Sequence, residues 1–158
     1  MELTLRSIKI AKHLSEETTA FTATVYIDGK KAGFARNDGR GGSNFVDWTD
    51  YGLAAEYKAW LEKETMPRQD PNDPEKIWLV EPQYRLDLLI SEALDAHEEQ
   101  QWFKTKCRKK TVFRLTTDEG EDSWRVVNAP FSPAVKAWLT TRYGDVLGEI
   151  ANETRIGG

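Results

Sequence analysis

The sequence predicts an α+β fold, and three observations indicate it. Short segments alternate apolar and polar side chains, an Asp-Gly pair joins two of them, and longer segments carry apolar residues at helical spacing. Alternation is typical of half-buried strands, and an apolar stripe is typical of helices that cover a sheet. We therefore expect one domain over 1–158, in which two β-hairpins and an N-terminal strand form antiparallel sheet packed with about four helices.

The N-terminal half, residues 1–65, begins with strand patterns. Residues 3–10 suggest an opening strand, and 21–27 alternate apolar side chains with Thr and Tyr. Asp28-Gly29 favours a two-residue hairpin turn, so we expect 31–36 to return antiparallel. Thr49 or Asp50 can then cap a helix, because an apolar stripe, Leu53, Tyr57, Trp60 and Leu61, follows at i, i+4, i+7 and i+8. The predicted order is β-β-β-α.

A proline-rich connection, residues 66–76, divides the chain near its middle. It contains Pro67, Pro71 and Pro74 among Asp, Asn and Gln. Proline lacks the N–H that a helix needs, and this composition is typical of exposed connections. We expect an exposed connection here.

The C-terminal half, residues 77–156, begins with a long predicted helix from Pro82 to about Phe103. Its stripe is Leu86, Leu89, Ile90, Ala93 and either Ala96 or His97. Residues 111–117 and 123–127 predict a second hairpin. Ser132-Pro133 predicts a helix start, Gly144 its end, and 145–150 a last short helix.

A four-residue motif, Lys-Ala-Trp-Leu, recurs in the two halves. It stands at 58–61 and again at 136–139, each time on a predicted helix that follows a hairpin. Two readings stay open. The halves are related pseudo-repeats, or a helix that covers a sheet simply places Trp and Leu in this way.

Composition excludes several function classes. The chain has a net charge of −4 and one cysteine, Cys107, so it lacks an internal disulfide and a thiolate zinc cluster. No apolar run approaches the roughly 20 residues of a membrane span, and the N-terminus lacks a secretory pattern. We expect a cytoplasmic protein with no membrane partner, no metal and no cofactor.

The segment best suited to touch a ligand is the glycine-rich loop, residues 37–44. Its glycines permit positive φ and expose N–H groups, the geometry of turns and anion-binding nests. Together with the preceding arginine, the predicted binding residues are Arg36, Asn37, Asp38, Gly39, Arg40, Gly41, Gly42, Ser43 and Asn44. The loop matches no complete phosphate motif, so a connection from strand to helix explains it equally well.

Two rival chemistries stay open. Asp38 and Asp47, with Asp50 nearby, can hold Mg²⁺ beside the loop, as in a phosphodiesterase or a nucleotide-processing enzyme. Alternatively, a basic run follows Trp102 and Phe103 and can bind nucleic acid through stacking and phosphate contacts. Its members are Lys104, Lys106, Arg108, Lys109 and Lys110, continued by Arg114.

The N-terminal region resembles small bacteriophage and prophage proteins of uncharacterised function. The resemblance lies in residues 3–44, with Val25 to Lys31 and the Asn-Asp-Gly-Arg-Gly-Gly run of the loop. It implies a phage accessory protein that binds and inhibits a host factor, such as a defence component, in the host cytoplasm. The expected partner is a host protein or an anionic small molecule or nucleotide, with nucleic acid second and no catalysis. A terminal Gly157-Gly158 also invites comparison with conjugated tails, although nothing else in the chain supports conjugation.

Overall fold

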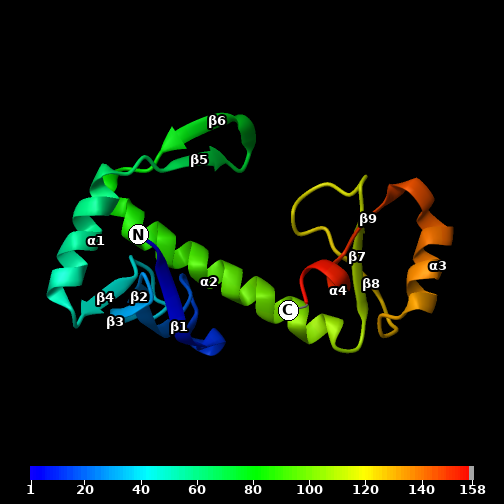
Figure 1. Cartoon of the computed structure of the whole chain (residues 1–158), viewed down its shortest axis with the longest axis horizontal. Coiled ribbons are helices and arrows are strands. Elements are labelled where there is room, and N and C mark those ends of the chain that lie inside the picture. The colour runs from blue at the N-terminus through cyan, green and yellow to red at the C-terminus, as the bar shows by residue number, and fades with distance from the viewer. Residues whose placement is uncertain (157–158) are drawn as a thin grey trace. The chain divides into compact units, whose positions relative to one another are not determined.

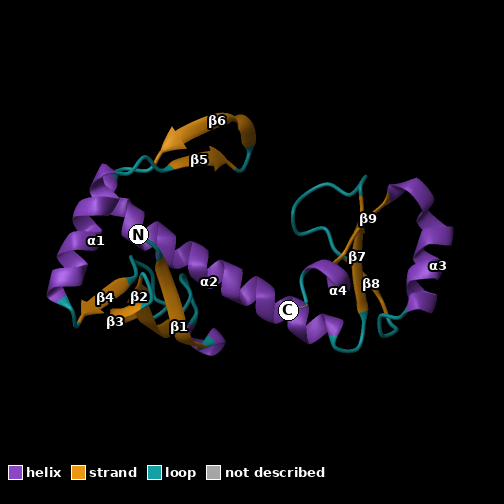
Figure 2. Cartoon of the chain, viewed as in Figure 1, coloured by secondary structure: helices purple, strands orange, loops and turns teal. Residues whose placement is uncertain are grey.

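Antiparallel strands and helices occupy both halves of the chain, which confirms the α+β class (Figures 1 and 2). The structure is a computed structural model that describes residues 1–156, so Gly157-Gly158 lies outside the described residues. The chain divides into two compact units, Met1–Leu94 and Asp95–Gly158. The boundary falls inside one long helix and not in the proline-rich segment 66–76.

The first unit is built on a four-stranded antiparallel sheet with the strand order β1-β2-β3-β4. Its strands are β1 (Leu3–Ile10), β2 (Phe21–Ile27), β3 (Lys30–Asn37) and β4 (Phe45–Trp48). The predicted Asp28-Gly29 hairpin is confirmed, with φ of 48° and 78° at the two residues. These positive values match the turn that suits the twist of paired strands.

Strand β4 changes the role of the glycine-rich loop. The predicted order, β-β-β-α, was one strand short, because Phe45–Trp48 pairs with β3 before the helix begins. The prediction missed this strand because it has only four residues and follows the glycine-rich loop. The loop therefore joins two neighbouring strands and does not lead straight into a helix.

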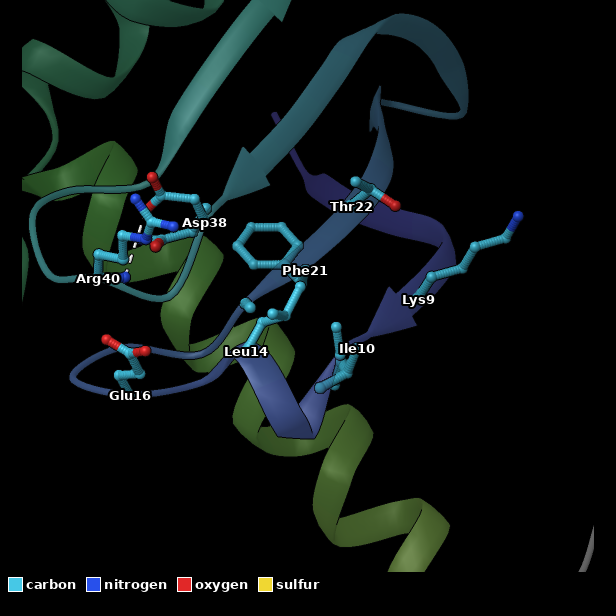
Figure 3. Close-up of a pocket in the computed structure, with 11 residues that line it drawn as sticks. Lys9, Ile10, Leu14, Glu16, Phe21, Thr22, Asp38 and Arg40 are labelled. Carbon is cyan, nitrogen blue, oxygen red and sulfur yellow. Dashed lines mark hydrogen bonds between the residues drawn. The ribbon is translucent and has the colours of Figure 1, made fainter.

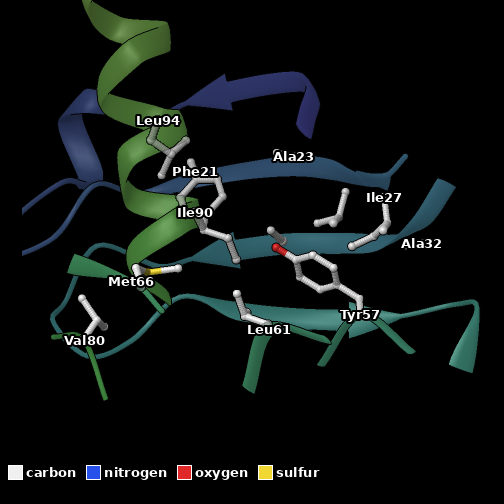
Figure 4. Close-up of a cluster of buried hydrophobic side chains, with 12 residues drawn as sticks. Phe21, Ala23, Ile27, Ala32, Tyr57, Leu61, Met66, Val80, Ile90 and Leu94 are labelled. Carbon is white, nitrogen blue, oxygen red and sulfur yellow. The ribbon is translucent and has the colours of Figure 1, made fainter. Parts of the chain in front are cut away.

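Two helices, α1 (Tyr51–Lys63) and α2 (Pro82–Cys107), follow this sheet. Asp50 is the N-cap of α1, and its carboxylate accepts a hydrogen bond from the Leu53 N–H. Figure 4 shows side chains of both helices against one face of the sheet. This core contains Phe21, Ala23, Val25, Ile27, Ala32, Ala35, Tyr57, Leu61, Met66, Val80, Ile90 and Leu94. The predicted α2 stripe omitted Leu94 and allowed Ala96, which is exposed.

The proline-rich segment is largely exposed, but it has regular structure that was not predicted. It forms a two-stranded hairpin of β5 (Pro67–Asp70) and β6 (Asp73–Leu79). Each strand of a two-stranded ribbon has one edge without a partner strand. A proline whose nitrogen faces that edge removes no hydrogen bond between the strands. Pro67 begins β5, and Pro71 lies in the turn.

The second unit contains a three-stranded sheet in the order β8-β7-β9. Its elements are β7 (Thr111–Leu115), β8 (Arg125–Val127), α3 (Pro133–Tyr143), β9 (Leu147–Ile150) and α4 (Ala151–Thr154). Phe113 and Leu115 pack with Leu139 of α3, whereas Val112 packs with Phe103 and Ala151. The alternation along β7 therefore serves two clusters, one on each face.

The start and the end of α3 are confirmed, but the predicted helix at 145–150 is not: a 3₁₀ turn, Gly144–Val146, leads into a strand. The Ser132 hydroxyl accepts a hydrogen bond from Val135 N–H, and Gly144 is the C-cap with φ of 54°. Residues 147–150, predicted as helical, form β9 and pair with β7. This short apolar segment pairs with the free edge of β7 and therefore forms a strand.

The recurring Lys-Ala-Trp-Leu motif occupies α1 and α3, and its leucine is buried in each copy, at Leu61 and Leu139. The tryptophans differ, because Trp60 is half-buried whereas Trp138 is 51% exposed. The two hairpins belong to different sheets, of four and three strands. Duplication stays a prediction.

Candidate functional site

A pocket of about 500 Å³ lies beside the glycine-rich loop, at the end of the four-stranded sheet (Figure 3). Residues of the first two strands and of the segment between them form it with the start of the loop. Its lining comprises Lys9, Ile10, Ala11, Leu14, Glu16, Ala20, Phe21, Thr22, Asn37, Asp38 and Arg40. Three predicted site residues are therefore part of a real hollow.

Asn37 and Gly39 hold the loop against the segment that precedes β2. The Asn37 amide oxygen accepts hydrogen bonds from the Thr18 hydroxyl at 2.7 Å and from the Gly39 N–H at 2.9 Å. The Gly39 carbonyl in turn accepts from the N–H groups of Glu16 and Glu17 at 3.0 and 2.9 Å. A side chain at Gly39 would meet the Leu14 carbonyl oxygen at 2.1 Å, so only glycine fits.

Three N–H groups of the loop donate hydrogen bonds to acceptors of the protein itself. Gly39 donates to Asn37, Arg40 donates to the Asp38 carboxylate at 3.2 Å, and Gly41 donates to the Thr18 hydroxyl at 3.3 Å. Donors that already have acceptors are poorly placed to cradle an anion. The expected contact through backbone N–H groups therefore loses its main support, and side chains must provide the recognition.

The other predicted loop residues lie outside the pocket. The Asn44 N–H donates to the Asp87 carboxylate at 2.6 Å, and its amide donates to Ser91, so this residue fastens the loop to α2. Arg36 lies over the ring of Phe45 on the sheet instead. Gly42 and Ser43 are exposed at the turn.

The pocket is apolar inside and carries both signs of charge on its lining. Ile10, Leu14 and Phe21 supply apolar surface, and Leu14 is 52% exposed although it is a large apolar residue. Lys9 and Arg40 are cationic, whereas Glu16 and Asp38 are anionic. Figure 3 shows Phe21 and Leu14 between the Arg40–Asp38 side and the Ile10–Lys9 side. Such a pocket suits an apolar group flanked by charges.

The three aspartates of the metal hypothesis have separate tasks. Asp38 accepts the Arg40 N–H, Asp50 caps α1, and Asp47 lies 3.6 Å from the Arg36 guanidinium. In the part of the chain that the structure describes, no group of three or more His, Cys, Asp or Glu side chains is placed to hold a metal ion. The metal-dependent enzyme therefore has no geometric support in residues 1–156.

The basic run at 104–110 leads from the end of α2 into the turn before β7. Phe103 is buried and is not available for stacking. Trp102 lines a hollow of about 400 Å³ with Glu98, Glu99 and Asp122, which repel phosphate. These surroundings give nucleic-acid binding at this run little support.

Cys107 lies at the end of α2, among the cations of the basic run. Burial raises the pKa of its thiol, so the cationic neighbours do not activate it. The half-buried side chain packs beside the cluster of Phe103, Val112 and Ala151. A structural role fits this thiol.

Sequence reasoning missed most of the pocket lining, because residues 9–22 carry no motif. One signal was present: Leu14 is a single large apolar residue in a polar stretch. Sequence reasoning also missed Phe34 and Phe45, whose side chains are 44% and 52% exposed on the first sheet.

No family model, curated protein or solved structure matches this chain. Among residues 1–156, no helix combines the length and the apolar character required to cross a membrane.

Proposed function

We propose that this chain is a non-catalytic binding protein that captures a partner protein through the pocket beside the glycine-rich loop. The pocket of about 500 Å³ carries the proposal. It combines an exposed apolar side chain, Leu14, with two cations and two carboxylates. A protein segment with an apolar anchor and charges of both signs matches this lining.

The charge pattern favours a protein over an anionic small molecule. Glu16 and Asp38 would repel a phosphate and offset the attraction of Lys9 and Arg40. Three loop N–H groups are also committed to internal acceptors. The resemblance to phage proteins supports a host protein as the partner and inhibition as the consequence.

The test is affinity capture from a bacterial host lysate with matched variants. The variant Leu14→Asp/Arg40→Glu changes an exposed apolar residue and an exposed arginine of the pocket. Trp138→Asp/Arg142→Glu makes the same changes on the exposed side of α3, where Trp138 is 51% exposed. We expect the wild-type chain and the α3 variant to retain the same host protein, and the pocket variant to lose it.

Two results would overturn the proposal. If the pocket variant retains the same protein as the wild type, the pocket is not the contact. If the purified chain hydrolyses a phosphodiester in the presence of Mg²⁺ and EDTA stops the reaction, the protein is an enzyme. Thermal unfolding of all variants confirms that each is folded.

A further inference from the structure

The four-stranded sheet has one face covered by helices and one open face. Ala23, Val25 and Ile27 of β2 are buried in the core, so the alternate residues of this strand point to the open face. The strand register extends this face across the sheet in two rows. The first row is Arg6, Thr24, Phe34 and Asp47, and the second is Lys9, Thr22, Arg36 and Phe45.

Large aromatic rings are exposed on this open face. Phe34 is 44% exposed and Phe45 is 52% exposed, and they lie on adjacent strands in consecutive rows. Tyr26 extends the face, since it pairs with Thr4 on one side and Lys31 on the other. Exposed rings that hold no core together indicate a surface that stacks on a partner.

Each ring has a cation over it. The Arg6 guanidinium lies 4.0 Å from the Tyr26 ring centre, the Lys31 ammonium 4.6 Å from that of Phe34, and the Arg36 guanidinium 4.8 Å from that of Phe45. These contacts hold the charged groups over the sheet and not out in solvent. A base that stacks on a ring would displace the cation from above it, and the displaced cation would remain within reach of the phosphates of the strand.

The positive charge of the open face indicates which class of partner it can bind. Its two rows and their Tyr26 extension carry four cations, Arg6, Lys9, Lys31 and Arg36, against one carboxylate, Asp47. This excess of positive charge occurs in a chain whose net charge is −4. Positive charge interleaved with exposed rings complements a single strand, whose phosphates are anionic and whose bases are free to stack.

We propose that this open face binds single-stranded nucleic acid. Bases stack on Phe34 and Phe45, and Arg6, Lys9, Lys31 and Arg36 contact the phosphates. Stacking and phosphate contacts accept every base, so the binding has little sequence preference. The site is separate from the basic run at 104–110.

Fluorescence anisotropy with labelled 20-mers of dT and rU, and with a duplex of equal length, tests the proposal. Phe34→Ala/Phe45→Ala should weaken single-strand binding at least about tenfold, because each stacked base contributes strongly. The control Val126→Ala/Trp138→Ala removes exposed apolar side chains of the second unit and should bind as the wild type does. Comparing dT with rU shows whether DNA or RNA is preferred.

Salt dependence tests the cations. Four phosphate contacts predict a slope of about −3 for log K against log salt, and Arg6→Gln/Arg36→Gln should make that slope shallower by about 1.4. The variant Lys104→Gln/Lys109→Gln should leave the affinity nearly unchanged.

Four outcomes would overturn the proposal. The first is no binding to either 20-mer at protein concentrations up to about 10⁻⁴ M. The second is unchanged binding by the aromatic double variant, and the third is equal affinity for the duplex. The fourth is binding to vesicles of anionic lipid without binding to the 20-mers. Circular dichroism and thermal unfolding of each variant show whether it is folded.

Discussion

At the scale of single residues, two glycines of the same loop have different roles although their backbone φ angles are equal. Gly39 and Gly42 share a φ of 84°. A side chain at Gly39 would meet the Leu14 carbonyl oxygen at 2.1 Å, whereas one at Gly42 would have nothing within 4 Å. Close packing and not ligand contact accounts for Gly39.

Alanine at these two positions separates backbone strain from steric overlap. Gly42→Ala should cost only the left-handed penalty, about 1–2 kcal/mol in the free energy of unfolding. Gly39→Ala should cost clearly more, because the Leu14 backbone must also move. Urea unfolding measures both, and equal losses would contradict the packing described for Gly39.

We expect Asp118 to make the stability of the protein depend on pH. Its carboxylate accepts two hydrogen bonds from Arg125, both at 2.9 Å, and one from the Leu115 N–H at 3.0 Å. The Arg125 guanidinium, helped by the Leu115 N–H, lowers the pKa of Asp118 from 3.8 to about 2. Because the folded-state pKa lies below the unfolded value, the stabilisation is present above about pH 4 and is lost as pH falls towards 2.

Asp118→Asn tests this linkage. The variant should be less stable than the wild type at pH 7, and the difference should shrink between pH 4 and pH 2 as the wild-type carboxylate takes up its proton. Chemical unfolding at several pH values measures it. A difference that stays constant from pH 7 to pH 2 would show that the Asp118 carboxylate charge has no stabilising role.

At the scale of elements, strong local signals predicted structure well. The Asp28-Gly29 turn, the Asp50 and Ser132 caps and the Gly144 stop all lie where the sequence placed them. Each of these signals depends on a few neighbouring residues. The strands that were missed, β4, β5, β6 and β9, are short or contain proline, so their local patterns are weak and only their pairing with β3, with each other and with β7 reveals them.

The candidate site was also predicted only in part. Glycine density located the loop, but its pocket depends on residues 9–22, which reach the loop through the β1–β2 and β2–β3 pairings. The Gly41 N–H of the loop, for example, donates to the Thr18 hydroxyl. No local pattern reveals an acceptor more than 20 positions away.

Arg85 joins the end of α1 to the start of α2. Its buried guanidinium donates to the carbonyls of Val80, Leu61 and Glu62 at 2.8–2.9 Å. Two of these carbonyls belong to the last turn of α1, where helix carbonyls lack partners. A single side chain therefore ties the end of α1 to the residue that follows β6, just before α2 begins.

Arg85→Met should lower the free energy of unfolding by about 2–3 kcal/mol, since buried carbonyls lose their donors. The exposed Arg142 of α3 provides the matched control, and Arg142→Met should change stability by less than about 0.5 kcal/mol. Thermal and urea unfolding compare the two. Equal effects would contradict the role given to Arg85.

At the scale of the whole molecule, the chain combines two compact units with different surfaces. The first unit carries the pocket beside the glycine-rich loop and the open basic face of its sheet. The second unit carries the hollow lined by Trp102 and three carboxylates. This distribution assigns the proposed binding activities to the first unit.

Site-specific photo-cross-linking tests the central claim, capture of a partner through the pocket, most directly. A benzophenone amino acid replaces Leu14 in one protein and Trp138 in another, since these side chains are nearly equally exposed, at 52% and 51%. After irradiation in host lysate, we predict a covalent adduct with one host protein from position 14 and none with that protein from position 138. Excess wild-type chain should suppress the adduct, whereas excess Leu14→Asp/Arg40→Glu should not. The same adducts from both positions, or none from position 14, would contradict the account.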